Sequence, residues 1–255
     1  MTVDASLRRG VHVLEALGSD EALAGGLGVT RIAELIRQDK SQVSRTLKTL
    51  AEQGLVDRDP ASRAYRLGWA VFALAARAGD TWLLATGEPV VRELARNVGE
   101  RVHLSVLRGT EVLTVHSWSP PRTIEAAGWV GRTVPAYCTS AGYALLLDAD
   151  VAEALAGVEL VRLGPNSPAS LDEVAARVAA VRTCGYAIAD EDFEPGLVAV
   201  AAPVHDVRGR IAAALNVSAP KFRLDSRIDA AGAAVADAAA RLSRLLAAGA
   251  SSPHS

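Results

Sequence analysis

The chain has 255 residues, half of them hydrophobic, and a formal net charge of −2, which predicts two domains and excludes a protein that binds polyanions over its whole surface. It holds no run of about 18 apolar residues and no N-terminal signal peptide, so neither a membrane span nor secretion is expected. Its two cysteines, Cys138 and Cys184, lack metal-ligand spacing, which fits a reducing cytoplasm and argues against a disulfide framework. No metal or other cofactor is expected.

Two amphipathic helices are predicted near the N-terminus. Residues 6–17 form the first, capped by Ser6, and the second runs from Thr30, its cap, to residue 36. A glycine-rich break at 25–28 separates them. The apolar residues of the two helices recur at helical spacing: Leu7, Val11, Leu14 and Leu17 in the first, and Ile32, Leu35 and Ile36 in the second.

A third helix, which ends at Gly54 and which Asp39 or Ser41 can cap, has an outer face suited to DNA. Val43, Leu47 and Leu50 form its inner stripe. The opposite side carries hydroxyls, an amide and cations: Lys40, Ser41, Gln42, Ser44, Arg45, Lys48 and Thr49. In a major groove, amide and guanidinium groups read base edges, whereas hydroxyls and ammonium groups hold phosphates. Any two small amphipathic helices in a bundle could show the same apolar spacing, so the DNA-binding interpretation depends also on the segment that follows.

A β-hairpin follows the third helix directly. Residues 55–58 and 64–67 are predicted strands around a turn at 59–62, and the hairpin carries Arg58, Arg63 and Arg66. Such a wing places its arginines against phosphates or in the adjacent minor groove. Between residues 37 and 66, seven cations outnumber four acids, so the attraction to DNA is local and should weaken with salt. Residues 1–68 are therefore predicted to be a winged helix-turn-helix domain that binds double-stranded operator DNA.

Residues 69–84 are predicted to be a linker helix. Its first part, 69–79, is apolar on nearly every side, and such a helix needs burial on more than one side. A second subunit would supply that cover and produce a homodimer or homotetramer. The alternative is an ordinary core helix of the second domain.

Residues 85–250 show an α+β pattern, and 251–255 are expected to be a disordered tail. Strands with period-two alternation are predicted at 101–108, 111–118, 123–127, 186–190, 197–204 and 211–218. Helices are predicted at 88–98, 139–147, 170–184 and 226–248. Ser170 is the expected cap of the third, with Glu173 at the capping-box position. Together these elements indicate an antiparallel sheet flanked by helices.

The segment 131–142 is the first candidate binding site of the second domain. Thr139 and Ser140 open a helix, whose free N–H groups and hydroxyls can hold a carboxylate or phosphate. Alternatively, Thr139 only caps its own helix. Cys138 could be a nucleophile, but no basic residue adjoins it in sequence, and a buried core thiol is the other interpretation.

The acidic run at 190–194 is the second candidate. Its four carboxylates could bind a cation or orient a polar ligand, or they could form an exposed acidic loop. His103, His116 and His205 lack metal-type spacing and are expected to be structural. No nucleophile elbow, phosphate-binding loop or pair of catalytic carboxylates is recognisable, which favours a sensing domain over an enzyme.

With these residues in view, the chain resembles the IclR family of bacterial transcriptional regulators over nearly its whole length. The resemblance rests on four segments: SLRRGVHVLEAL, KSQVSRTLKTLAEQGLV, GRTVPAYCTSAGYALL and DEDFEPGLVAVAAPVHDVRGRIAAALNVSAP. It implies a winged helix-turn-helix, a linker helix that dimerises the chain, and a GAF-like domain that binds a small organic acid or aromatic compound. Tyr143 stands where a lysine or arginine is common in the family.

Carried onto this chain, the resemblance implies that the effector lies between the loop at 137–142, the segment at 190–191 and the end of the strand at 211–218. The residues expected to contact it are Tyr137, Cys138, Thr139, Ser140, Ala141, Gly142, Asp190, Glu191 and Ser218. Tyr137 and Tyr143 would add aromatic surface there, which favours an aromatic carboxylate. The expected function is repression relieved or enforced by this effector. An activator of a catabolic operon, an enzyme that uses Cys138 and a ligand-independent architectural DNA binder are the alternatives.

Overall fold

The computed structural model describes residues 2–75, 81–121 and 128–250. The chain forms two compact units that divide between residues 81 and 82. The predicted strand at 123–127 and the predicted tail at 251–255 lie outside the described residues. None of the described helices is both long enough and apolar enough to cross a membrane.

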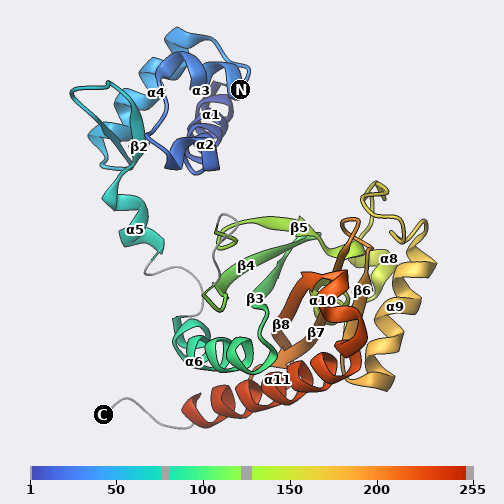
Figure 1. The fold of residues 1–255 in the computed structure, drawn as a ribbon. Coiled ribbons are helices and arrows are strands. Elements are labelled where there is room, and N and C mark those ends of the chain that lie inside the picture. The colour runs from blue at the N-terminus through green and yellow to red at the C-terminus, as the bar shows by residue number, and fades with distance from the viewer. Residues whose placement is uncertain (1, 76–80, 122–127, 251–255) are drawn as a thin grey trace. The chain divides into compact units, whose positions relative to one another are not determined.

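The N-terminal unit is a winged helix-turn-helix (Figure 1). Its elements are α1 (Thr2–Leu17), α2 (Asp20–Leu23), α3 (Val29–Leu35), α4 (Lys40–Glu52), β1 (Val56–Arg58), β2 (Tyr65–Leu67) and α5 (Trp69–Ala75). β1 and β2 pair antiparallel as the predicted wing. The Asp39 carboxylate caps α4 by accepting the N–H groups of Ser41 at 2.9 Å and Gln42 at 3.2 Å. The core of the unit is built from Val13, Leu17, Leu27, Ile32, Val43, Leu47, Val56 and Tyr65.

The predicted caps of the first two helices, and part of their predicted apolar faces, are wrong. α1 begins at Thr2, so Ser6 lies inside it, and Leu7 and Val11 are exposed. Of the predicted stripe, Leu17 is in the core and Leu14 packs against it, and Val13 joins them, because the C-terminal half of α1 is the part that reaches the other helices. In α3 the cap residue is Gly28, which makes no side-chain hydrogen bond, and Leu35 is exposed.

The C-terminal unit is an α+β domain built on an antiparallel sheet, as predicted. Within the described residues its strands lie in the order β5-β4-β3-β8-β7-β6. Their bounds are β3 (Arg101–Arg108), β4 (Glu111–Trp118), β5 (Thr133–Pro135), β6 (Ala187–Asp190), β7 (Leu197–His205) and β8 (Ile211–Pro220). The helices are α6 (Thr81–Val98), α7 (Ser140–Leu145), α8 (Val151–Ala154), α9 (Leu171–Cys184), α10 (Lys221–Leu224) and α11 (Ile228–Ala250). Ser170 caps α9 as expected, accepting the Glu173 N–H at 3.2 Å.

Helices cover both faces of this sheet (Figure 1). On one face α6 and α11 pack on apolar strand residues such as Val102, Leu104, Leu215 and Val217. On the other face α7 and α9 pack on small strand residues, of which Ala201 and Ala214 are examples. Because side chains alternate along a strand, every second residue of β3 and β8 belongs to the second face, and this is where the pocket lies.

Candidate DNA interface and ligand pocket

The outer face of α4 presents the predicted DNA-binding side chains to solvent. Lys40, Ser41, Ser44, Arg45, Lys48 and Thr49 are exposed and Gln42 is half-buried. Val43 and Leu47, on the inner side, are fully buried. The Arg45 side chain folds along its own helix, where Nε donates to the Ser41 carbonyl at 3.3 Å. Its terminal amino groups form no ion pair with a carboxylate among the described residues.

The wing carries Arg58, Arg63 and Arg66, all exposed. Asp59 shapes the turn between its strands, since its carboxylate accepts the N–H groups of Ala61 at 3.0 Å and Ser62 at 2.7 Å. The Arg58 guanidinium lies 5.2 Å from the centre of the Tyr65 ring, which holds the arginine against the hairpin. The structure thus places the helix and wing residues on the surface of one unit, with cations on both.

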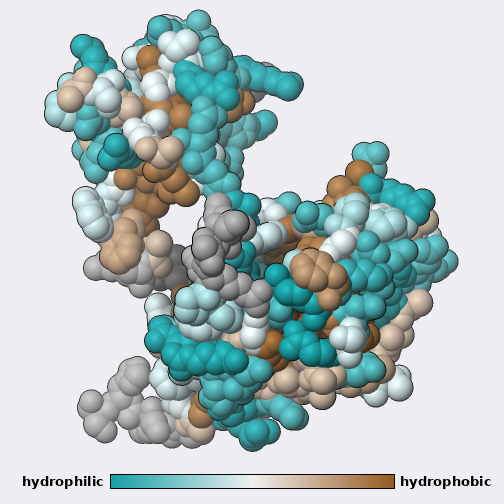
Figure 2. Space-filling model, viewed as in Figure 1, coloured by the Kyte–Doolittle hydropathy of each residue, from teal (hydrophilic) through white to brown (hydrophobic). Residues whose placement is uncertain are grey.

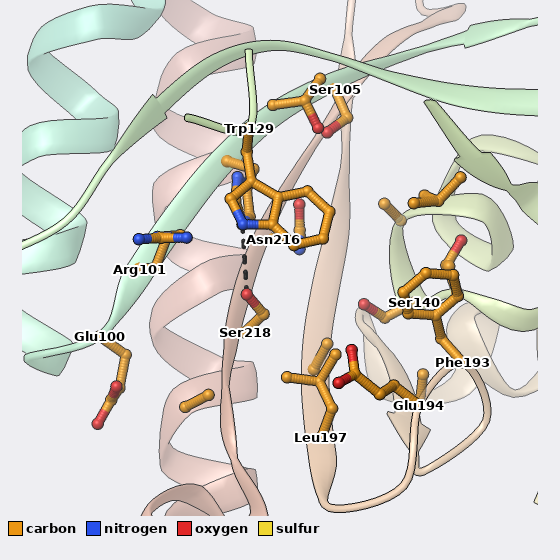
Figure 3. Close-up of a pocket in the computed structure, with 18 of the residues that line it drawn as sticks. Glu100, Arg101, Ser105, Trp129, Ser140, Phe193, Glu194, Leu197, Asn216 and Ser218 are labelled. Atoms are coloured by element: carbon orange, nitrogen blue, oxygen red, sulfur yellow. Dashed lines mark hydrogen bonds between the residues drawn. The ribbon is translucent and has the colours of Figure 1, made fainter. Parts of the chain in front are cut away.

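The C-terminal unit contains a pocket of about 350 Å³ on the second face of its sheet (Figure 3). Its floor consists of alternate residues of β3 and β8: His103 and Ser105 from one strand, Asn216 and Ser218 from the other. The intervening residues, Val102 and Leu104 or Leu215 and Val217, point into the apolar core. Each of the two strands therefore contributes apolar side chains to the core on one face of the sheet and polar side chains to the pocket floor on the other.

Aromatic and apolar side chains form the walls. Trp129 lies edge-on to His103, with 5.5 Å between the ring centres, and Phe193 faces the pocket from the loop between β6 and β7 (Figure 3). Val112, Val134 and Leu197 complete the apolar lining. This combination of apolar walls and few polar groups is typical of small-molecule sites.

Arg101 and Glu100 stand at one end of the pocket (Figure 3). Glu100 is nearly fully buried and forms an ion pair with Arg223, with N–O distances of 3.1 and 2.9 Å. Arg101 donates from Nε to the Ser119 hydroxyl at 2.7 Å, and no carboxylate among the described residues forms an ion pair with it.

Two buried polar atoms of the pocket have no hydrogen-bond partner among the described residues: His103 Nδ1 and Ser140 Oγ. His103 Nε2 lies 3.3 Å from the Ser218 hydroxyl. Burial, assisted by the Arg101 charge, lowers the pKa of His103 to about 3. The imidazole is thus neutral at physiological pH and can hydrogen-bond to a hydroxyl or carbonyl of a ligand, but it cannot neutralise a carboxylate.

Four of the predicted effector residues line the pocket: Thr139, Ser140, Ala141 and Ser218. Thr139 also caps α7, because its hydroxyl accepts the Gly142 N–H at 3.2 Å, which is the alternative interpretation of this residue. α7 has only six residues, and the cationic side chains that line the pocket are those of Arg101 and Arg223.

The other five predicted effector residues have different roles. Tyr137 is buried and its hydroxyl donates to the Val161 carbonyl at 2.8 Å. Cys138 is fully buried, and burial raises the pKa of its thiol to about 12, so the thiol stays protonated and is a poor nucleophile. Gly142 lies against the Ala136 backbone. Asp190 and Glu191 pair with Lys221 Nζ, at 2.7 and 2.9 Å.

The acidic run is partly internal rather than an exposed loop. Asp192 is nearly fully buried and accepts from the Tyr143 hydroxyl at 2.6 Å and from Arg177 Nε at 2.8 Å. These bonds tie the loop to α7 and α9. Tyr143 is therefore a core residue, and the aromatic surface that we expected from it comes from Trp129 and Phe193 instead. The described residues contain no cluster of three His, Cys, Asp or Glu side chains that could hold a metal ion.

Sequence reasoning missed most of the pocket floor. We expected His103 to be structural, and we did not single out Ser105, Asn216 or the aromatic walls. A signal existed: polar residues alternate with valine and leucine on strands whose polar positions are buried, including His103, Ser105, Thr114 and Asn216. Buried polar side chains on a central strand need hydrogen-bond partners. An internal pocket is one way to give them such partners.

The fold and its two surfaces define a class of protein: a winged helix-turn-helix joined to a separate small-molecule domain. The family model of the IclR helix-turn-helix domain matches residues 6–60. The model described as bacterial transcriptional regulator IclR C-terminal matches residues 78–244. The chain belongs to the IclR family of bacterial transcriptional regulators, as the resemblance predicted.

Named relatives agree with this assignment. The chain is 31% identical over 247 residues to the HTH-type transcriptional regulator BhcR of Paracoccus denitrificans, covering 93% of this chain and 86% of the relative. It is 33% identical over 257 residues to the glycerol operon regulatory protein of Streptomyces griseus, covering 95% of this chain and 99% of the relative. Both are named as regulators, and neither as an enzyme.

Solved structures show the same fold. An IclR transcriptional regulator from Alicyclobacillus acidocaldarius superposes with a TM-score of 0.80 at 27% identity, covering 95% of this chain and 98% of the other. An IclR homologue from Microbacterium hydrocarbonoxydans, solved in complex with 4-hydroxybenzoate, superposes with a TM-score of 0.83 at 24% identity, covering 95% and 99%.

Proposed function

We propose that this protein is a cytoplasmic repressor whose operator affinity is controlled by a small organic acid bound in the pocket of the C-terminal unit. The observation that carries the proposal is the Arg101 guanidinium, which lines a pocket with aromatic and apolar walls and a polar floor and has no carboxylate partner among the described residues. An activator with the same surfaces is the alternative, and the sign of the transcriptional response distinguishes the two.

The pocket favours an aromatic carboxylate that carries a hydroxyl or carbonyl. Arg101 would bind the carboxylate, and Trp129 and Phe193 would enclose the ring. The neutral His103 and the buried Ser140 hydroxyl would take the second polar group, since both have an unpartnered atom there. 4-Hydroxybenzoate, the compound in the complex of the Microbacterium homologue, has these groups and is the first compound to test.

The regulatory mechanism follows from linkage. In a homodimer or homotetramer, two copies of α4 enter successive major grooves only if they are spaced about 34–36 Å apart or a multiple of it. A ligand that binds one arrangement of the subunits better than another shifts the population by its differential affinity. DNA affinity and ligand affinity must then change each other by the same factor, which fluorescence anisotropy on DNA and ligand titration measure separately.

The DNA interface is tested with Arg45→Ala. If Arg45 reads a guanine, we expect operator binding to weaken by about 1–3 kcal/mol, that is roughly 5- to 150-fold. The measurement is fluorescence anisotropy on the DNA upstream of the gene, with unrelated duplex as competitor. Arg208→Ala removes an exposed arginine from the hairpin between β7 and β8 and is the control for charge alone. If Arg45→Ala binds the operator as tightly as the wild type does, the assignment of α4 as the helix that reads the DNA is wrong.

The ligand site is tested with Arg101→Gln. Loss of a charged hydrogen-bond partner should weaken binding of an aromatic carboxylate by at least about tenfold, while operator affinity without ligand stays unchanged. Arg108→Gln is the matched control, because it lies on the same strand but is exposed and does not line the pocket. If no carboxylate raises the thermal stability of the wild type, the pocket does not bind this class and a ligand-independent DNA binder becomes the better description.

A further inference from the structure

Arg37 occupies an unfavourable backbone conformation in the turn between α3 and α4. Its φ is +51°, in the left-handed region that glycine adopts freely and that side chains with a Cβ atom disfavour. Among the described residues only three other than glycine have a positive φ. Two of them are arginines of the N-terminal unit: Arg37 and, in the wing turn, Arg63 with φ +60°.

The rest of the unit does not explain why an arginine stands at residue 37. Its side chain is exposed, and no described carboxylate forms an ion pair with it. Arg31, six residues earlier, shows the contrast, because it pairs with Glu21 at 2.8 Å and with Glu34 at 3.3 Å. Arg31 thus stabilises the fold, whereas Arg37 adds strain to the backbone and gains no ion pair in return. Such an outlier points to a partner outside the chain.

The position of Arg37 indicates what that partner is. It lies two residues before Asp39, the N-cap of α4. In a helix-turn-helix the N-terminal residues of the recognition helix enter the major groove, so the turn before them approaches the sugar–phosphate backbone. The Asp39 carboxylate is needed there as a cap, but it repels phosphate. A cation in the same turn offsets that repulsion and attracts the anion.

We propose that Arg37 binds a phosphate of the DNA backbone beside the N-terminus of α4, and that the turn tolerates a strained backbone to hold it there. This inference rests on the proposed role of α4 in DNA binding. A phosphate contact carries no base information, so Arg37 would strengthen binding to every sequence equally. Affinity for DNA and stability of the N-terminal unit then place opposite demands on this residue.

The test compares Arg37→Gly and Arg37→Asn with the wild type in the full-length protein. Both variants relieve the strain, so the melting temperature of the N-terminal unit should rise by about 4 °C. Both remove the cation, so the salt slope of DNA binding should fall by about 0.9 per subunit. The affinity gained on lowering salt from 1 M to 0.15 M should then shrink about fivefold per subunit, equally for operator and unrelated duplex.

Arg37→Lys keeps both the charge and the strain and should retain the wild-type salt slope and melting temperature. Arg208→Gly is the control for loss of one cation far from α4 in the chain, and its slope should be unchanged. An Arg37→Gly protein with a wild-type salt slope, or with a lower melting temperature, would overturn the inference. Arg45→Ala in the same series separates the two proposals: if it weakens binding while Arg37→Gly does not, only the role of Arg37 is lost.

Discussion

His103 links the geometry of the pocket to the acid stability of the protein. Its folded-state pKa is about 3 because the ring is buried beside Arg101, whereas in the unfolded chain it is about 6.5. As the pH falls below 6.5, the unfolded chain binds a proton that the folded chain does not. The stabilising effect of a neutral His103 is therefore complete above about pH 6.5 and is lost progressively as the pH falls towards 3.

We predict that His103→Gln flattens this pH dependence. One proton bound only by the unfolded chain lowers the free energy of unfolding by about 1.4 kcal/mol per pH unit. Between pH 7 and pH 5 the wild type should lose about 2 kcal/mol more than the variant, measured by urea denaturation of the C-terminal unit. Asn216→Ala, at the position paired with His103 across the strands, lacks a titrating group and should run parallel to the wild type. A His103→Gln curve parallel to the wild type would contradict the burial argument.

At the scale of elements, the sequence predicted the long central strands well, but it missed the short strand β5 and misjudged which apolar helix residues are buried. β3 and β4 match their predicted bounds because period-two alternation marks them clearly, and Gly109 adopts the positive φ that the turn between them needs. α2, α8 and α10 are each four residues long, too short for periodicity to show. Leu7 and Val11 follow helical spacing yet are exposed, since spacing defines a face of a helix but not what covers it.

The same reasoning explains which site residues could be predicted. The residues on the outer face of α4 belong to a single helix, and its helical periodicity alone separates them from the buried side. They could therefore be named from the sequence. The pocket instead combines strands, loops and a helix that lie far apart in the chain. His103 Nε2 and the Ser218 hydroxyl lie 3.3 Å apart on the pocket floor but are separated by 115 positions in sequence, and no local pattern connects the two.

Gly142 illustrates how two elements determine each other's position. A Cβ atom there would lie 2.0 Å from the Ala136 carbonyl oxygen, so α7 packs directly on the segment before it. We predict that Gly142→Ala forces the two apart and lowers the free energy of unfolding of the C-terminal unit by at least about 1–3 kcal/mol. Calorimetry of the full chain should show this loss. Gly10→Ala is the control, since a Cβ in α1 meets nothing within 4 Å, and it should stabilise slightly. Equal melting of Gly142→Ala and the wild type would show that this close approach does not constrain the domain.

At the scale of the whole molecule, α5 is a helix whose apolar side chains are not covered by the rest of the single chain. None of its side chains is buried, and Trp69, Phe72 and Leu74 are 79%, 65% and 62% exposed. Figure 2 shows apolar atoms gathered over this segment. Trp69 and Phe72 pack only edge to face on each other, with 5.9 Å between the ring centres. An apolar helix of this kind calls for a partner, and in our proposal the partner is a second copy of the chain.

We therefore predict that Phe72→Glu dissociates the homodimer. Burial of a phenylalanine contributes about 2–3 kcal/mol per subunit, so loss of both copies should raise the dissociation constant at least about 100-fold. Analytical ultracentrifugation over a range of concentrations measures this. Phe222→Glu, at an 85% exposed position of α10, should leave the mass unchanged. Dimers of equal stability in wild type and Phe72→Glu would move the subunit contact away from α5.

The two faces of the central sheet also bear on how such a regulator diversifies. His103 and Asn216 face the pocket, while their chain neighbours Leu104 and Leu215 face α6 and α11. Under the proposed function, substitutions at the first pair change which molecule is recognised, whereas those at the second pair change the packing of the core. Gene duplicates could acquire new inducers by drift at a few alternate strand positions while inheriting an intact scaffold, and the same positions are the rational choice for a library aimed at a biosensor of altered specificity.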